Sequence, residues 1–284
     1  MLGSIGATAE GPRAPARRLP RVLAYHKVTR FELGGTWVSA PRFIRQIDAL
    51  LADGFHFIDE DSFLAALDGE RTAGEREVLL TFDDGYLELL DHAIPALDER
   101  GIRALLFLVT DFVGKENTWE LALPWRRAAH MGWDEAADLG RRGFSFGSHS
   151  RTHRDLTRLS AAEAADELEG SKAELEARLG TPARSFSYPF GRTSAALGAA
   201  AERAGYRAGF TLCRPRPALP IERFALRREG VYVIDTTASI ERKLGDGFPF
   251  FVEDLKGRLI NGCAVITPIL KGAFARGNRS ARHR

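Results

Sequence analysis

Residues 79–86 read LLTFDDGY, and this short stretch is the strongest single indication of the fold. An apolar run leads directly into Asp83, Asp84 and Gly85. Successive side chains of an extended strand point to opposite faces, so two adjacent carboxylates can serve one site only where the strand has ended. Glycine permits a sharp turn at that point. We therefore expect a buried strand followed by two carboxylates with different tasks, although a helix cap and an arginine pair would also explain them.

The chain around this stretch alternates short apolar runs with amphipathic helical patterns. Strands are expected at 21–26, 55–59, 78–84, 103–109, 144–149, 184–190, 208–212 and 226–233. Helices are expected at 41–52, 92–100 and 161–179, the last with a capping box of Ser160 and Glu163 and an end at Gly180. Such alternation indicates an α/β fold with a mainly parallel sheet. Functional residues of such sheets collect at the carboxyl ends of the strands, where the aspartate pair lies.

Composition and charge restrict the possible functions. The 284 residues are 44% hydrophobic with a formal net charge of +2, which is typical of a globular protein and gives no reason to expect a nucleic-acid partner. Residues 1–20 are rich in arginine and proline, lack the apolar run of a secretory signal, and are expected to form a disordered basic leader. Residues 21–250 should form the catalytic domain, and residues 251–284 a basic tail. The apolar part of that tail, 259–270, is too short and interrupted to span a bilayer.

A second stretch, SHSRTHRDL at 148–156, carries His149 and His153, four residues apart. On a helical turn this spacing would put both imidazoles on one face. Two histidines and one carboxylate are a common way to hold a Zn²⁺-like ion with a position left for water. Because both stretches follow expected strands of one sheet, we expect one of the two aspartates to share a site with the histidines, although paired surface histidines would also give this spacing.

Two further stretches end strands of the expected sheet. In RSFSYPFG at 184–191, the backbone after Pro189 could present the N–H of Phe190 to an oxyanion, or could simply form a turn. In VLAYHKV at 22–28, His26 ends the first strand and could act as a general acid, or could be satisfied by a backbone carbonyl.

Taken together, these motifs resemble the polysaccharide deacetylases, carbohydrate esterase family four. TFDDGY matches the first motif of that family, SHSRTH the second and FSYPFG the third, and the resemblance covers about residues 21–235. It implies a distorted (β/α) barrel of about seven parallel strands and metal-dependent removal of N-acetyl groups from amino sugars. The YHKV start is similar to the branch that acts on poly-N-acetylglucosamine, in which an N-terminal histidine supplies the acid.

The resemblance also implies roles for individual residues. The ligands of a divalent metal, Zn²⁺ first with Co²⁺, Ni²⁺ or Mn²⁺ as alternatives, would be Asp84, His149 and His153. The catalytic groups would be Asp83 as base, His26 as acid and the Phe190 N–H as oxyanion donor. Tyr188 is expected to contact an N-acetylated sugar. Trp119, in a loop-like insertion at 115–133, is also expected to do so because tryptophan faces often stack on sugar rings, although the tryptophans of this insertion could instead pack the barrel rim.

The chain departs from the family pattern at two places. Many members orient the base with an arginine just before the third motif, where this chain has Ser187; Arg227 or Arg228 is a possible substitute. Many members also end with a leucine-x-histidine motif that supplies the acid. The only histidine after His153 is His283, so the acid is assigned to His26.

Three other interpretations remain open at the level of sequence. GFSFG at 143–147 satisfies the pattern of a serine esterase, but its alternating phenylalanines predict a strand. A glycosidase could use Asp83 and Asp84, although adjacent residues seldom reach the required separation of about 5 Å or more. A sugar-binding module without catalysis could use the same scaffold.

Location is inferred from the same features. The absence of a signal peptide or transmembrane segment predicts a cytoplasmic protein. The basic tail suggests peripheral contact with an anionic membrane surface, with a solvated, disordered end as the alternative.

Overall fold

The computed structural model describes residues 18–32, 35–119, 128–212 and 222–245, and positions 252, 253 and 255. Within these residues, seven parallel strands close into a barrel in the order β1-β10-β9-β8-β7-β6-β5, because β5 pairs back onto β1. Their bounds are β1 Arg21–Tyr25, β5 Glu77–Phe82, β6 Leu105–Leu108, β7 Ser145–Ser148, β8 Ser185–Ser187, β9 Ala208–Leu212 and β10 Leu226–Gly230. The predicted seven-stranded (β/α) barrel is confirmed.

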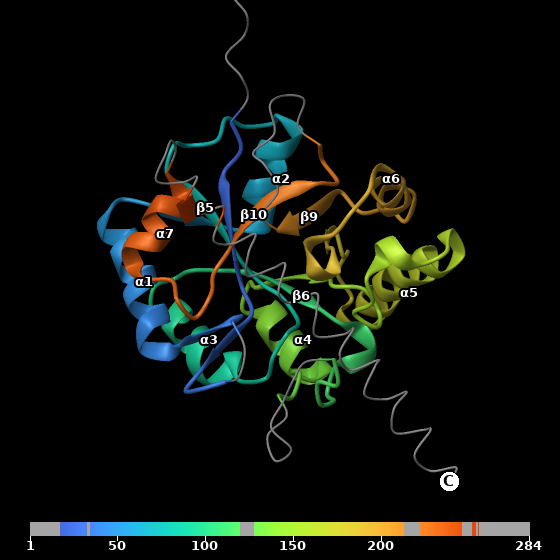
Figure 1. Cartoon of the computed structure of the whole chain (residues 1–284), viewed down its shortest axis with the longest axis horizontal. Helices are drawn as coiled ribbons and strands as arrows, with labels where there is room; N and C mark the ends of the chain where they lie inside the picture. The colour runs from blue at the N-terminus through green and yellow to red at the C-terminus, as the bar shows by residue number, and fades with distance from the viewer. Residues whose placement is uncertain are drawn as a thin grey trace, which may run out of the picture.

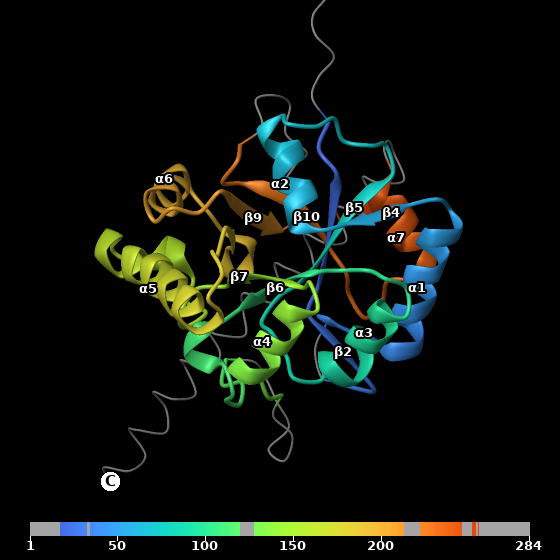
Figure 2. The ribbon, with the colours of Figure 1, turned by 180° about the vertical axis from the view of Figure 1, so that it is seen from behind.

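Helices surround the barrel on its outside (Figures 1 and 2). They are α1 Ala40–Ala52, α2 Glu60–Asp68, α3 Leu89–Asp98, α4 Trp133–Arg141, α5 Ala161–Leu179, α6 Ala195–Arg203 and α7 Thr237–Leu244. The predicted α5 has the expected bounds and its complete capping box, and it ends at Gly180 with φ 66°. Although far apart in the sequence, α1 and α7 lie side by side.

Several short elements were not predicted from the sequence. β2 (Lys27–Thr29) and β3 (Trp37–Ser39) form a separate parallel pair. By contrast, β4 (His56–Ile58) lies within the predicted strand at 55–59 and pairs with β5 outside the closed ring. Strands of three residues are too short to show a period. The sequence analysis also did not predict α2, α6 and α7.

The strands of the barrel are buried on both faces. Adjacent residues of β5 alternate between two apolar clusters, since Leu79 packs with Phe107 and Phe210, whereas Leu80 packs with the cluster beneath the helices. This alternation explains why the sequence of β5 is a continuous apolar run rather than a period of two.

The strand ends matter most for the site. β5 ends at Phe82, two residues before the end of the predicted strand, so both aspartates lie beyond it. The predicted leader and tail fall almost entirely outside the described residues. Within the described part of the chain, no helix is long and apolar enough to cross a membrane.

Candidate active site

The turn after β5 separates the two adjacent aspartates. The Asp83 N–H donates to the Tyr25 carbonyl (2.9 Å) and continues the pairing with β1. Asp84 and Gly85 then adopt left-handed conformations, with φ 68° and 65°. A Cβ at Gly85 would overlap the side chain of Leu108, so the turn needs glycine for space as well as conformation. The chain reverses direction here, and the two carboxylates therefore meet different partners.

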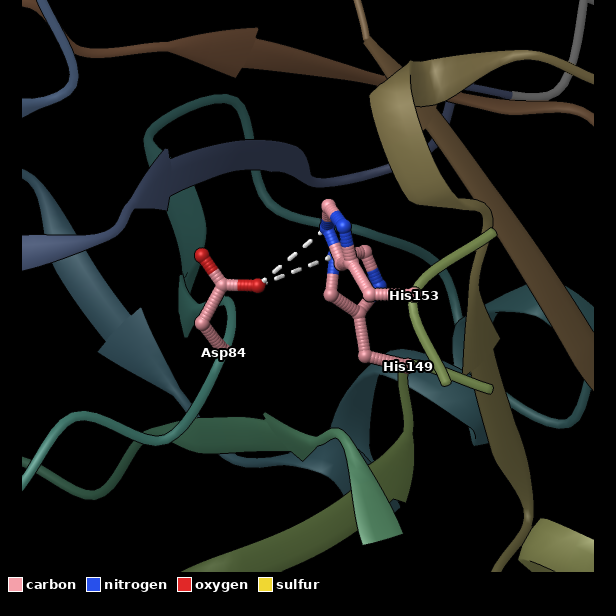
Figure 3. Close-up of side chains that lie close together, drawn as sticks. All are labelled: Asp84, His149 and His153. Carbon is pink, nitrogen blue, oxygen red and sulfur yellow. Dashed lines mark ion pairs between the residues drawn. The ribbon is translucent and has the colours of Figure 1, made fainter. Parts of the chain in front are cut away.

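Asp84 faces two imidazoles. Its Oδ1 lies 3.6 Å from Nε2 of His149 and 3.4 Å from Nε2 of His153 (Figure 3). One ligand atom from each residue lies within 4.8 Å of the others, and all three side chains are buried. Ligand atoms held tetrahedrally about 2.0–2.1 Å from Zn²⁺ stand roughly 3.4 Å apart. The spacing and the donor set therefore fit a divalent cation.

The protonation of the histidines also suits a cation. Nδ1 of His149 lies 2.8 Å from the Ser187 carbonyl, which only accepts, so Nδ1 carries the proton and Nε2 presents its lone pair to Asp84. Burial lowers the pKa of His149 to about 4 and also holds the pKa of His153 well below its usual value. Both imidazoles are therefore neutral ligands near neutral pH.

The helical turn expected for the histidine pair is wrong. His149 and His153 lie in a loop after β7, and that loop contains left-handed Ser150 (φ 68°) and His153 (φ 59°). The two rings approach with centroids 4.9 Å apart because the backbone curls over serine side chains, whereas a helix would carry them on one face. The sequence thus identified the three side chains that gather here but not the conformation that brings them together.

Asp83 pairs with Arg228. The guanidinium donates from Nη1 to Oδ1 and from Nη2 to Oδ2, both at 2.7 Å, and Nη2 also donates to Ser187 Oγ at 2.7 Å. Arg228 has no exposed surface and lies over the Phe107 ring. Burial alone would raise the pKa of Asp83, but Arg228 and neighbouring imidazoles outweigh it and hold this pKa well below its usual range. Asp83 is therefore a fixed, ionised carboxylate.

The sequence left two arginines as candidates for orienting Asp83, and Arg228 is the one that contacts it. Arg227 pairs instead with Glu229, Nε to Oε1 at 2.6 Å. Alternation along β10 sends adjacent side chains to opposite faces, so only one of the two can reach Asp83. Ser187, at the position where an arginine was looked for in the sequence, accepts from Arg228 through its hydroxyl oxygen.

His26 follows β1 and lies on the Asp83 side of the site. Its Nε2 is 3.9 Å from Asp83 Oδ2, and 13% of its side chain is exposed. His26 therefore lies at the same end of the barrel as the other site residues, as the sequence predicted. Because its side chain is partly exposed, it can exchange a proton with an incoming molecule.

Phe190 lies in a tight turn beside the imidazoles. Its φ is 59°, and its ring meets the His153 ring edge-on at 4.9 Å. Two backbone hydrogen bonds close this turn: the Gly191 N–H donates to the Tyr188 carbonyl at 2.8 Å, and the Arg192 N–H donates to the Pro189 carbonyl at 3.3 Å. Neither bond involves the Phe190 N–H. The predicted oxyanion donor therefore lies next to a metal ligand.

The two residues predicted to contact sugar are placed differently. Tyr188 has no exposed surface, and its ring packs on Phe186 (5.1 Å) within the core, which argues against contact with a substrate. Trp119 is half-buried and stacks on His153, with centroids 4.5 Å apart and planes at 14°. The face of Trp119 on His153 is therefore not available to a sugar ring.

Two supporting residues were missed in the sequence. Asn117 accepts from the Trp119 N–H (2.9 Å) and donates to the Tyr86 hydroxyl (2.7 Å). Nδ1 of His130 lies 2.7 Å from the Asp84 carbonyl and donates to it, which supports the left-handed turn. No spacing in the sequence links either residue to the motifs, because both belong to the insertion.

The fold and the three-ligand site define a class: (β/α)-barrel proteins with a divalent-cation site at the carboxyl ends of the strands. The polysaccharide deacetylase family matches residues 70–209, the segment that holds both aspartates and both histidines. The chain is similar to this polysaccharide deacetylase family over that segment, just under half of its length.

Individual relatives are distant. The YxkH protein of Bacillus subtilis (strain 168), a polysaccharide deacetylase by name, is 24% identical over 84% of this chain and 77% of its own length. The deacetylase PplD of Streptococcus pyogenes, solved in complex with acetate, superposes with a TM-score of 0.69 at 19% identity, covering 81% of this chain and all of PplD. IcaB of Ammonifex degensii superposes with a TM-score of 0.63 at 24% identity, covering 79% of this chain and 94% of IcaB. At these identities the solved structures support the fold.

Proposed function

We propose that this protein is a metal-dependent carbohydrate N-deacetylase that hydrolyses an N-acetyl group of an amino sugar and releases acetate. The main support for the proposal is that the two adjacent carboxylates contact different partners. Asp84 faces the two histidines, whereas Asp83 is held by Arg228 and stays out of the ligand set. This leaves an ionised base beside a cation site, as amide hydrolysis requires.

Each residue of the site has a separate task in the proposed reaction. A divalent ion held by Asp84, His149 and His153, for which Zn²⁺ is the first candidate, would polarise the acetamide carbonyl and lower the pKa of water. Asp83 takes the proton from the attacking water. The Phe190 N–H donates to the oxygen that becomes negative as the carbonyl carbon turns tetrahedral. His26 donates a proton to the departing nitrogen, since an amine leaves poorly unless protonated. Acetate and a free amine are the products.

Acetate release across a panel of N-acetylated mono- and oligosaccharides tests the proposal. We expect one equivalent of acetate and one of free amine, with the glycosidic bonds intact. New reducing ends without acetate would instead support a glycosidase. Binding of acetylated oligosaccharide without turnover, in metal-loaded protein, would support the non-catalytic module.

The role of His26 predicts a dependence on the leaving group. Replacing His26 with asparagine should lower kcat for an N-acetyl sugar by about 10²–10⁴, the range of general acid catalysis. Hydrolysis of an activated aryl acetate should fall much less, because its phenolate leaves without a proton. A parallel loss on both substrates would contradict the assignment, and Asp83→Asn, which should slow both, is the matched control.

The stacking of Trp119 on His153 predicts an effect on the metal. Replacing Trp119 with leucine should weaken Zn²⁺ binding about tenfold, as loss of a group supporting a ligand does, with KM for a monosaccharide little changed at saturating Zn²⁺. Calorimetric titration of the metal-free protein with Zn²⁺ measures the first quantity. A raised KM with unchanged Zn²⁺ affinity would instead support the sugar contact predicted from sequence.

We also propose a cytoplasmic location with peripheral contact between the basic tail and an anionic membrane. The support is the excess of arginine and lysine after residue 270. Sedimentation of the full chain with anionic and neutral vesicles tests it, and equal binding to both would contradict the electrostatic contact.

A further inference from the structure

We propose that Glu167 on α5 is a positioning residue for the metal ligand His153, acting by shaping the loop at 149–153. The inference rests on the proposed metal-dependent function for the role of His153. It concerns a buried carboxylate that belongs to none of the three motifs and reaches the site only through the loop.

The loop needs an external support because its backbone is strained. Ser150 and His153 both have positive φ, at 68° and 59°, although neither is glycine. Such conformations persist only where the surroundings over-determine them. Without that support the loop would relax, and the His153 ring would move away from Asp84.

Glu167 supplies that support with three hydrogen bonds. Its Oε2 accepts from the backbone N–H groups of Arg151 and Thr152, each at 2.9 Å, and its Oε1 accepts from the Thr152 hydroxyl. Glu167 is only 3% exposed, so these bonds form away from water. The carboxylate thus satisfies two consecutive backbone donors directly before His153.

Ser171, one helical turn further along α5, provides a second anchor. The Ser148 hydroxyl donates to Ser171 Oγ at 2.6 Å and accepts from the Ser150 N–H at 3.1 Å. The Ser150 hydroxyl in turn accepts from the His153 N–H at 3.0 Å. Residues four apart share one helix face, so Glu167 and Ser171 hold both ends of the loop from a single side of α5.

Gly170 explains how the loop can lie so close to the helix. A Cβ at this position would lie 2.7 Å from Cδ of Arg151. The Arg151 side chain crosses α5 there and reaches Asp166 on the surface, Nη1 to Oδ2 at 2.7 Å. Asp166 therefore contacts the same loop residue through an exposed pair and offers a matched control for Glu167.

The test compares Glu167→Gln with Asp166→Asn. Glutamine keeps the size of the side chain but removes its negative charge. Its NH₂ group can still donate to the Thr152 hydroxyl, but its neutral oxygen accepts the two backbone N–H bonds more weakly than a carboxylate does. We expect calorimetry on metal-free protein to show Zn²⁺ binding weakened about 10- to 100-fold in Glu167→Gln and unchanged in Asp166→Asn. At saturating Zn²⁺, kcat of Glu167→Gln should return toward that of the wild type.

The outcomes separate this inference from the proposed function. Wild-type protein that binds no divalent ion would overturn the function and this inference with it. Wild-type Zn²⁺ affinity in folded Glu167→Gln would overturn the inference alone. Thr152→Val is the second variant, and it removes only the hydroxyl bond to Glu167. We expect it to lose less Zn²⁺ affinity than Glu167→Gln. If Glu167→Gln does not fold, unchanged Zn²⁺ affinity in Thr152→Val would overturn the inference.

Discussion

Replacing Arg228 with methionine should lower kcat by about 10²–10⁴ and leave Zn²⁺ binding intact. Arg228 forms a bidentate ion pair that holds Asp83 in place and keeps it ionised. The expected loss of kcat equals the contribution of general-base catalysis, which is about 10²–10⁴. The change also leaves a buried carboxylate without its cation, so unfolding free energy should fall by about 3–5 kcal/mol. Steady-state acetate release, metal content and denaturant unfolding measure the three quantities.

Arg227→Met is the matched control for this variant. It removes a neighbouring arginine that pairs with Glu229 on the other face of β10, and kcat should change little. Combining Arg228→Met with Asp83→Asn should be no slower than Asp83→Asn alone, because both act through one carboxylate. Additive losses would show that Arg228 does not work through Asp83.

Removing the metal should abolish acetate release, and adding Zn²⁺ to the stripped protein should restore it. Replacing His153 with alanine should have the same effect and weaken Zn²⁺ binding by more than about 100-fold, beyond the losses known for supporting residues. The three ligands are the sole Asp/Glu/His/Cys cluster with this geometry in the described residues. Metal analysis, calorimetry and acetate release give the result.

Exposed His56 on β4 is the control for a histidine loss, and His56→Ala should keep both metal and activity. A serine-directed inhibitor should have no effect, because Ser145 of GFSFG lies within β7, as its pattern predicts, and not on a sharp turn. Full activity in protein shown by analysis to be metal-free would contradict the proposed mechanism.

The sequence by itself determined which three side chains gather at the site and the course of the strands. Asp84, His149 and His153 follow strands that are visible as apolar runs, and carboxyl ends of parallel strands meet at one end of a barrel. For the same reason the sequence placed His26, which ends the first predicted strand, at this end of the barrel. Local patterns such as the capping box of α5 also gave its exact bounds.

Only the tertiary structure decided what surrounds those ligands. Arg228 was one of two candidates, and closure of the barrel, with β10 paired to β1, brings it to Asp83. The loop of His153 was expected as a helical turn but is held by Glu167, and Trp119 packs on the metal ligand while Tyr188 faces the core. Such contacts join segments far apart in the chain, and no periodicity or spacing within one segment encodes them.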